Sequence, residues 1–316
     1  MDITFNEISG PGYFLLYRVE EPLDTDSEPY IEIAGIDKIT NAFKENGKLI
    51  IPEKINGYEV RSIRKFAFYG DKYIKNAILP DTISAIREGA FRCSDVVSVH
   101  LGKNIKEIEE DAFSTSHLLA NINLPEGLEK IHDSVFKSCS SLKSITLPDT
   151  LTHLGRSVFD YCESLESIHI GSGLEDMQIL AAFAYKCKNL SNITVSPFNK
   201  HFKACGNALY GIDNNQLIRA FSGPQKVNLS IPGWVSDVTT CSFDSVSLKN
   251  LVIRTPSLPS ISFANFKDID DIYCIVDSQV YSSLNSIGTF AIHPIKENNL
   301  NRFLESINDN IKDLNE

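Results

Sequence analysis

Histidines, cysteines and clustered carboxylates are the residues of this chain that could do chemistry, and none forms a catalytic pattern. The sequence contains no G-x-S-x-G, no H-E-x-x-H, no phosphate-binding loop and no dinucleotide fingerprint. His100 and His169 fall at equivalent outward positions of a repeating strand, three repeats or about 15 Å apart at the spacing of neighbouring strands. That distance is too long for a shared metal ion or a proton relay. We interpret both as solvated surface histidines.

The acidic clusters are weak candidates for a metal site. Asp24-x-Asp26-x-Glu28 has the spacing that begins a calcium-binding loop, but the glycine and the distal glutamate are missing. An ordinary acidic turn accounts for it, and the acidic run at 107–111 is interpreted as a solvated corner. The sequence therefore predicts no metal, no cofactor and no enzyme. The alternative, a hydrolase with an unrecognised site in the insertion near 199–221, has no acid–base pair or nucleophile to support it.

The seven cysteines show no zinc pattern either, because no C-x-x-C pair occurs. Cys139 and Cys162 share one position of a repeat, and Cys93 and Cys187 are predicted to occupy the same position in variant repeats. Side chains in one ladder point the same way rather than at each other, which disfavours disulfides between them. We expect these cysteines to be small buried hydrophobic residues.

A phenylalanine that returns every 22 or 23 residues shows how the chain is organised. It occurs at Phe68, Phe91, Phe113, Phe136 and Phe159, with spacings of 23, 22, 23 and 23 residues. A fixed period in this range is typical of a solenoid, in which one repeat cannot bury its apolar face alone. The repeats thus favour one elongated body over separate globular domains.

A single repeat can be interpreted physically from 131 to 153. Leu142-x-x-Ile145-x-Leu147 alternates at its end, as expected of a short strand, and Pro148 stops it because proline has no N–H for the ladder. The segment that follows returns the chain and brings the ring of Phe159 into the centre. Stacked coils of this kind predict a right-handed solenoid with a parallel β-sheet on its concave face.

Three segments follow from the pattern. Residues 1–47 are predicted to form an N-terminal β cap, and 48–275 a solenoid interrupted by a β-hairpin insertion at about 199–221. Residues 276–316 are predicted to form a C-terminal cap with an amphipathic helix, because Leu300, Phe303, Leu304 and Ile307 fall at helical spacing. Such caps hide the edge strands of an open solenoid. The helix is expected to lie over the last coil, with partner binding as the alternative.

The outward side chains of the strands are the best candidates for a binding surface, since solenoids bind partners on an extended concave sheet. They are small and polar, with none of the aromatic anchors that usually carry interface energy. They suit a broad contact of low affinity. Trp234, the only tryptophan, marks either an edge contact or a core position. The predicted ladder consists of Asn76, Ser98, His100, Asn121, Asn123, Ser144, Thr146, Ser167, His169, Asn192, Thr194, Asn250 and Arg254.

Composition limits the choice of partner. The 316 residues carry a net charge of −11, so nucleic-acid binding is not expected, and no apolar run is long enough for membrane insertion. The first residues have neither a basic stretch nor an apolar stretch, so no secretory signal is predicted. The compartment stays open: cytoplasmic if Met1 is the native start, cell surface or secreted if a signal segment has been removed.

The repeats resemble the BspA-like, or Treponema-type, leucine-rich repeat family over about residues 45–275. The resemblance is carried by Ile, Ala-Phe, a frequent Cys and Leu-x-x-Ile-x-Leu-Pro in register, as in Ile86…Ala90-Phe91 and in Ile131…Phe136-x-x-Cys139 with 142–148. It implies a leucine-rich repeat solenoid with a non-enzymatic, protein-binding role, which in this family includes adhesion to host or microbial surface proteins. An intracellular protein-interaction scaffold is the alternative.

Overall fold

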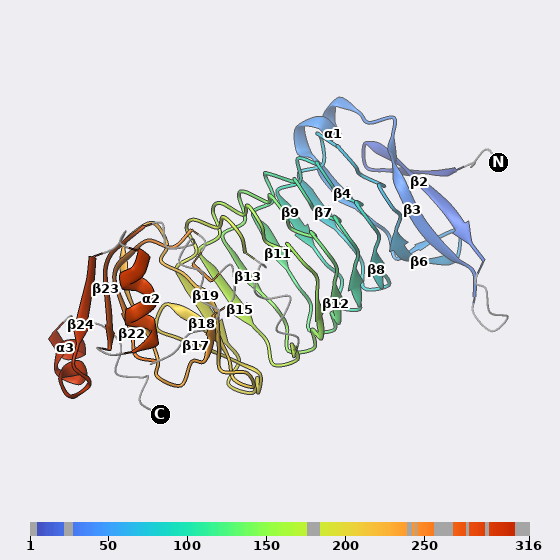
Figure 1. The fold of residues 1–316 in the computed structure, drawn as a ribbon. Helices are drawn as coiled ribbons and strands as arrows, with labels where there is room; N and C mark the ends of the chain where they lie inside the picture. The colour runs from blue at the N-terminus through green and yellow to red at the C-terminus, as the bar shows by residue number, and fades with distance from the viewer. Residues whose placement is uncertain are drawn as a thin grey trace.

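The computed structural model describes residues 5–21, 28–175, 184–238, 242–243, 245–255, 268–275, 278–287 and 291–306. It is an elongated stack of coils, with the first strands at one end and the last helices at the other (Figure 1). The predicted solenoid is therefore confirmed. Of the acidic turn at 24–28, only Glu28 belongs to the described residues, so the calcium-loop hypothesis lies outside them.

An antiparallel meander covers the N-terminal end, as predicted for a β cap. Strands β1 (Asn6–Gly10), β2 (Tyr13–Glu20) and β3 (Tyr30–Asp37) pair in sequence, and a short helix α1 (Asn41–Asn46) follows. Alternate residues of β2 are buried, as period-two patterning requires. The Tyr13 hydroxyl donates to the carbonyl of Ile50 and accepts from the Ile50 N–H, both at 2.9 Å, which ties the meander to the first coil.

The predicted parallel strands form one side of the coils. Each has two or three outward residues around a buried centre, and equivalent residues lie opposite one another. We call these strands the ladder. They are β4 (Lys48–Ile50), β7 (Asn76–Ile78), β9 (Ser98–His100) and β11 (Asn121–Asn123) in one sheet, then β13 (Ser144–Thr146), β15 (Ser167–Ile170) and β16 (Asn192–Val195) in a second.

A second stack of parallel strands closes the opposite side, and the sequence did not predict it. Its strands are mostly two residues long, too short for a visible alternation, and they continue the N-terminal meander through the pairing of β3 with β6. They are β6 (Tyr58–Ile63), to which β5 (Lys54–Ile55) pairs antiparallel, β8 (Ala85–Ile86), β10 (Glu107–Ile108), β12 (Lys130–Ile131) and β14 (His153–Leu154).

The repeating phenylalanines form one column in the interior. Phe91, Phe113, Phe136 and Phe159 are fully buried, and successive ring centroids lie 5.3, 5.6 and 5.7 Å apart with interplanar angles of 9°, 10° and 3°. Phe68 begins the column at 4.9 Å from Phe91, tilted by 30°. The central expectation from the sequence, rings of successive coils packed into one interior, is confirmed.

Two residues with left-handed backbone conformation flank each phenylalanine of the column, one two positions before it and one two positions after it. Only glycine adopts such a φ without strain, yet most coils use other residues. The residues before the ring are Phe66, Gly89, Asp111, Ser134 and Ser157, and those after it are Gly70, Cys93, Thr115, Ser138 and Tyr161, all with φ between 55° and 69°.

Three buried thiols donate to a carbonyl of the preceding coil. Cys139 and Cys162 follow Phe136 and Phe159 by three residues, and Cys187 follows Ala184 by three. Cys139, Cys162 and Cys187 reach the carbonyls of Phe113, Phe136 and Phe159 at 3.2, 3.1 and 3.0 Å. Their burial is as predicted, and burial raises the pKa of all three thiols, that of Cys187 to about 12.

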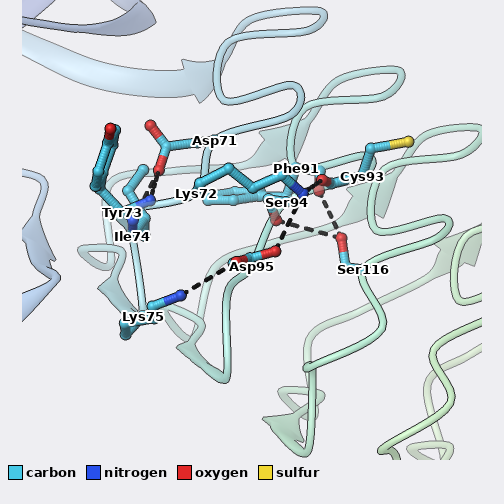
Figure 2. Close-up of polar contacts among 10 residues, drawn as sticks. All are labelled: Asp71, Lys72, Tyr73, Ile74, Lys75, Phe91, Cys93, Ser94, Asp95 and Ser116. Carbon is cyan, nitrogen blue, oxygen red and sulfur yellow. Dashed lines mark hydrogen bonds and ion pairs between the residues drawn. The ribbon is translucent and has the colours of Figure 1, made fainter.

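The prediction that Cys93 shares this position is wrong. Ser94 and Ser116 occupy it: the Ser116 hydroxyl donates to the Phe91 carbonyl at 2.6 Å and lies 3.2 Å from the Ser94 hydroxyl. Cys93 stands one residue earlier, at a left-handed corner, and its sulfur points away from the two serines (Figure 2). Cys93 therefore has the residue type of the repeating cysteines but not their place in the coil.

The predicted insertion is present, but it is a three-stranded meander rather than a simple hairpin. It comprises β17 (Phe202–Cys205), β18 (Ala208–Gly211) and β19 (Gln216–Ala220), and β19 pairs in parallel with β21 (Asp237–Val238). Phe202 and Leu209 pack into the core of the phenylalanine column, and Tyr210 and Leu217 into a second core. The insertion therefore joins two cores instead of standing beside the solenoid.

The coils after the insertion are covered on their outward side, which contradicts part of the predicted ladder. Asn250 is 7% exposed and donates to the Asn228 side chain at 2.8 Å, and Arg254 is half-buried beyond the strand end. Neither belongs to an open face. The C-terminal sheet consists of β20 (Val227–Ile231), β22 (Leu248–Ile253), β23 (Ile269–Ile275) and β24 (Ala291–Ile295).

The C-terminal helix covers part of this outward face. Leu300 and Leu304 of α3 (Leu300–Ser306) pack on Val252, which is completely buried, so the helix lies across the outward face of the sheet. Helix α2 (Gln279–Ile287) and a short 3-10 turn (Glu297–Asn299) precede it. The start of the predicted amphipathic helix is confirmed, whereas Ile307 lies outside the described residues.

Candidate binding surface

Eleven of the thirteen predicted ladder residues line an open face between β7 and β16. The buried residue at the centre of each strand, such as Ala77, Val99 or Ile122, forces its two neighbours outward because side chains alternate along a strand. Ser98, Ser167 and His169 are half-buried. The exposed ones are Asn76, His100, Asn121, Asn123, Ser144, Thr146, Asn192 and Thr194.

Hydrogen bonds between neighbouring strands hold some of these side chains. The Ser98 hydroxyl donates to the Asn76 side-chain oxygen at 2.6 Å, and His169 Nδ1 lies 2.9 Å from the Thr194 hydroxyl. His100 is paired in register with Asn123 and remains exposed. Three strand steps, from β9 to β15, separate the two histidines. The interpretation that they form no joint site stays a prediction.

The corners that flank the ladder use carboxylates to build the coils rather than to bind ligands. Asp149 accepts the Ser172 N–H at 2.7 Å, and this bond holds the pKa of the Asp149 carboxyl below its usual range. Asp81 does the same for the Lys103 N–H at 2.9 Å, and its pKa is lowered chiefly by the hydrogen bond from the Lys103 side chain. These aspartates are therefore structural.

The acidic run at 107–111 is more than the solvated corner that we expected. Glu109 pairs with Arg87 at 2.7 Å, and Asp111 with Arg92 at 2.8 Å, each partner lying in the preceding coil. A similar contact links Asp95 to Lys72 and Lys75 at 3.1 and 3.3 Å (Figure 2). The carboxylates near the corners thus cross-link coils.

Asp95 shows how these ion pairs affect titration. Partial burial alone would raise the pKa of the Asp95 carboxyl, but the hydrogen bonds from Lys72 and Lys75 outweigh it and hold the pKa below its usual range. The charged form is thereby favoured. Among the described residues, no group of three or more His, Cys, Asp or Glu side chains could hold a metal ion.

An exposed apolar site at the end of the ladder was not predicted. Phe198 is 77% exposed and Ile212 41% exposed, and between β16 and β17 lies a pocket of about 350 Å³. Its lining includes Ile193, Thr194 and Phe202. The only sequence signal was Pro197-Phe198 directly after a strand, which a turn within the insertion explains equally well. The pocket lies between a ladder strand and a strand of the insertion, and no pattern within one repeat encodes that packing.

The structure supports a core position for Trp234, while a contact with a partner at the edge of the binding surface stays a prediction. Its ring is half-buried against the second core and makes an edge contact with Tyr210 at 5.2 Å between centroids. The ammonium group of Lys203 lies 4.8 Å from the centroid of the indole ring. The tryptophan therefore closes the second core beside β17.

The chain belongs to the BspA-type leucine-rich repeat family. The family profile matches six copies of the repeat, over residues 40–121, 61–191, 117–211 and 217–312. These matches cover most of the chain and include both sides of the insertion. The resemblance seen in the repeats is thereby confirmed. Leucine-rich repeats of this kind form protein-interaction modules.

Solved structures of bacterial leucine-rich repeat proteins share the fold. One from Bacteroides ovatus is 22% identical with a TM-score of 0.58, covering 87% of this chain and 71% of that one. One from Eubacterium ventriosum is 22% identical with a TM-score of 0.59, covering 74% and 63%. A leucine rich cell surface protein from Faecalibacterium prausnitzii is 22% identical with a TM-score of 0.54, covering 85% and 77%. No curated protein sequence matches the chain.

Proposed function

We propose that this chain binds a protein partner through the ladder face, and that the partner is a host or microbial surface protein. One observation carries the proposal: eleven polar side chains stand on six successive strands of two sheets, in register within each sheet, from Asn76 to Thr194. These side chains do not belong to the hydrophobic core, which lies on the other side of each strand. Family membership supports a binding role without catalysis.

The dimensions of the face indicate the kind of contact. Five strand steps span about 24 Å, and three residues of a strand about 10 Å, so the ladder alone offers about 240 Å². A standard protein interface buries about 800 Å² on each partner. The ladder is therefore the centre of a wider contact. Because it has no aromatic anchor, it contributes mainly shape and hydrogen-bond complementarity and little of the binding free energy.

The test compares two positions of the ladder with a control on the opposite stack. Asn123→Arg combined with Thr146→Arg places two large charged side chains in the middle of the ladder, where both native residues are exposed. His153→Arg, on the exposed side of β14, is the matched control. Binding is measured against a panel of purified extracellular matrix and bacterial surface proteins.

The ladder variant is expected to bind at least tenfold more weakly than the wild type, and the control within twofold. Equal binding by wild type and ladder variant, or no binding to any panel member, would refute the proposal. An intracellular scaffold would use the same face. Protease digestion of intact cells separates the two, because only a surface protein is cleaved.

A further inference from the structure

Among the described residues, β16 is the last strand of its sheet, and no strand pairs with its outer edge. Asn192 donates its N–H to the Glu166 carbonyl at 3.1 Å, and Ser196 donates to Ile170 at 2.8 Å, so the even-numbered residues face β15. Backbone groups alternate in direction along a strand, which turns those of Ile193 and Val195 away from β15. Within the described part of the chain, neither residue has a backbone partner on that side.

Strand β17 presents a second edge to the same space. Ile212 donates to the His201 carbonyl at 2.8 Å, so the odd-numbered residues of β17 pair with β18. The backbone groups of Phe202 and Ala204 therefore face the other way. The Phe202 N–H is taken by the Asn199 side chain at 2.9 Å, which leaves the Phe202 carbonyl and both groups of Ala204 on the free edge.

The pocket between β16 and β17 follows these edges. It is lined by five consecutive residues, 193–197, whose side chains alternate in direction, so it runs along the backbone of β16 rather than over one face. Its other wall includes Phe202, Lys203 and Ala204. Neighbouring strands lie about 4.8 Å apart, a strand rises about 3.3 Å per residue, and stacked sheets lie about 10 Å apart. The product of these lengths gives about 160 Å³ for one residue of a strand. The volume of about 350 Å³ thus suits about two residues of an extended chain.

Two apolar side chains stand at this pocket. Phe198 follows the lining residue Pro197 and is the most exposed of the large apolar side chains described, and Ile212 is itself part of the lining. An exposed phenylalanine beside a concave site is the kind of anchor that the ladder itself does not have. The pocket includes Thr194 of the ladder, so a partner on the ladder face reaches it without leaving the protein surface.

We propose that the pocket between β16 and β17 binds an extended peptide segment of the partner by strand addition to β16. This inference rests on the proposed function and names how the partner is held. Unpaired N–H and C=O groups of a strand edge match only another extended backbone. The peptide segment of the partner must contain two consecutive residues that are not proline. It must also have an apolar side chain next to them that contacts Phe198.

The probe is the peptide Thr-Val-Thr-Val-Thr-Val-amide with fluorescein on its N-terminal amine, and its control is the same peptide N-methylated at every residue, which removes the donors of both edges. Methylation removes backbone donors and leaves the side chains unchanged. We expect measurable binding of the first peptide by fluorescence anisotropy, and at least tenfold weaker binding of the second. Saturating peptide is expected to slow amide hydrogen exchange at Ile193 and Val195 at least tenfold, with little change at Thr194, which already faces β15.

Protein variants locate the binding. Phe198→Ala is expected to weaken peptide binding at least threefold, whereas Leu118→Ala, which truncates an apolar side chain that is 43% exposed elsewhere, leaves it unchanged. Val195→Pro removes one free donor and is expected to abolish peptide binding, with folding checked by circular dichroism. The ladder variant carrying Asn123→Arg and Thr146→Arg is expected to keep peptide binding, so failure of the ladder proposal and of this one can be told apart.

Three results would overturn the inference. The first is equal binding of the plain and the methylated peptide, and the second is unchanged exchange at Ile193 and Val195 at millimolar peptide. The third is a dimer in analytical ultracentrifugation that Val195→Pro dissociates, since a second copy of the chain would then be the occupant of the edge.

Discussion

Replacing Phe136 by alanine tests the aromatic column on which the coils depend. The ring is completely buried and lies between Phe113 at 5.6 Å and Phe159 at 5.7 Å, nearly parallel to both. Removing a buried phenylalanine destabilises a core by about 3–5 kcal/mol, and each lost ring contact is worth about 0.5–1.5 kcal/mol beyond buried area. Because two ring contacts are lost, we expect the upper part of that range, about 4–5 kcal/mol.

The position of a ring in the column should decide the size of the effect. Phe68 is also buried but contacts only one ring of the column, Phe91, at a tilt of 30°. Phe68→Ala is therefore expected to lose about 1 kcal/mol less than Phe136→Ala. Phe198→Ala is the control, because a side chain that is 77% exposed should change stability by no more than about 0.5 kcal/mol.

The assay is urea unfolding followed by circular dichroism, together with amide hydrogen exchange. In a solenoid each coil contacts only its neighbours, so exchange should accelerate first in the coils that contain Phe113, Phe136 and Phe159. A double variant with Phe113→Ala should show a coupling energy of about 0.5–1.5 kcal/mol between the two rings. A loss below about 1 kcal/mol for Phe136→Ala would show that the column is not central to stability.

Two further predictions concern the thiols and the spacing of the coils. Because burial raises the pKa of Cys139, Cys162 and Cys187, the folded chain keeps these thiol protons while the unfolded chain releases them above about pH 9. The melting temperature is therefore expected to fall as pH rises from 8 to 10.5. It is expected to fall less in the triple Cys→Ser variant, whose hydroxyls can donate as Ser116 does. An identical decline in both proteins would contradict this assignment. A Cβ at Gly102 would lie 2.1 Å from the Pro80 carbonyl oxygen of the preceding coil, so Gly102→Ala is expected to destabilise by about 2–3 kcal/mol. Gly233→Ala, with its nearest atom at 3.7 Å, is expected to stay within about 0.5 kcal/mol, and equal urea midpoints for the two variants would rule out the close approach.

Several features could be predicted because they repeat. The spacing of the phenylalanines, the Leu-x-x-Ile-x-Leu strands and the buried thiols at 139, 162 and 187 each depend on contacts that recur between neighbouring coils. Periodicity in the chain thereby becomes adjacency in space. The outward orientation of the ladder side chains follows from the same repetition. The prediction for Cys93 was wrong because this residue matched the repeat by type while its position differed by one.

Most of the features that were missed do not repeat from coil to coil. Asn250 and Arg254 have the pattern of outward residues, but helix α3 packs on Val252 between them, and a contact between segments about fifty residues apart leaves no local mark. The two-residue strands around Ile108 and Ile131 are too short to show alternation. The pocket beside Ile193 lies between β16 and β17, so it depends on how the insertion packs rather than on the repeat pattern.

The amino-acid sequence by itself determined the coil, its period, the buried column and the family, because each coil meets a near copy of itself and the same apolar positions must then be buried in every turn. Only the tertiary structure decided where the ladder stops, which of its faces is covered and which strand edges stay unpaired. Those outcomes depend on how the insertion and the C-terminal helix pack against the coils, and non-periodic contacts of that kind are not encoded in any one repeat.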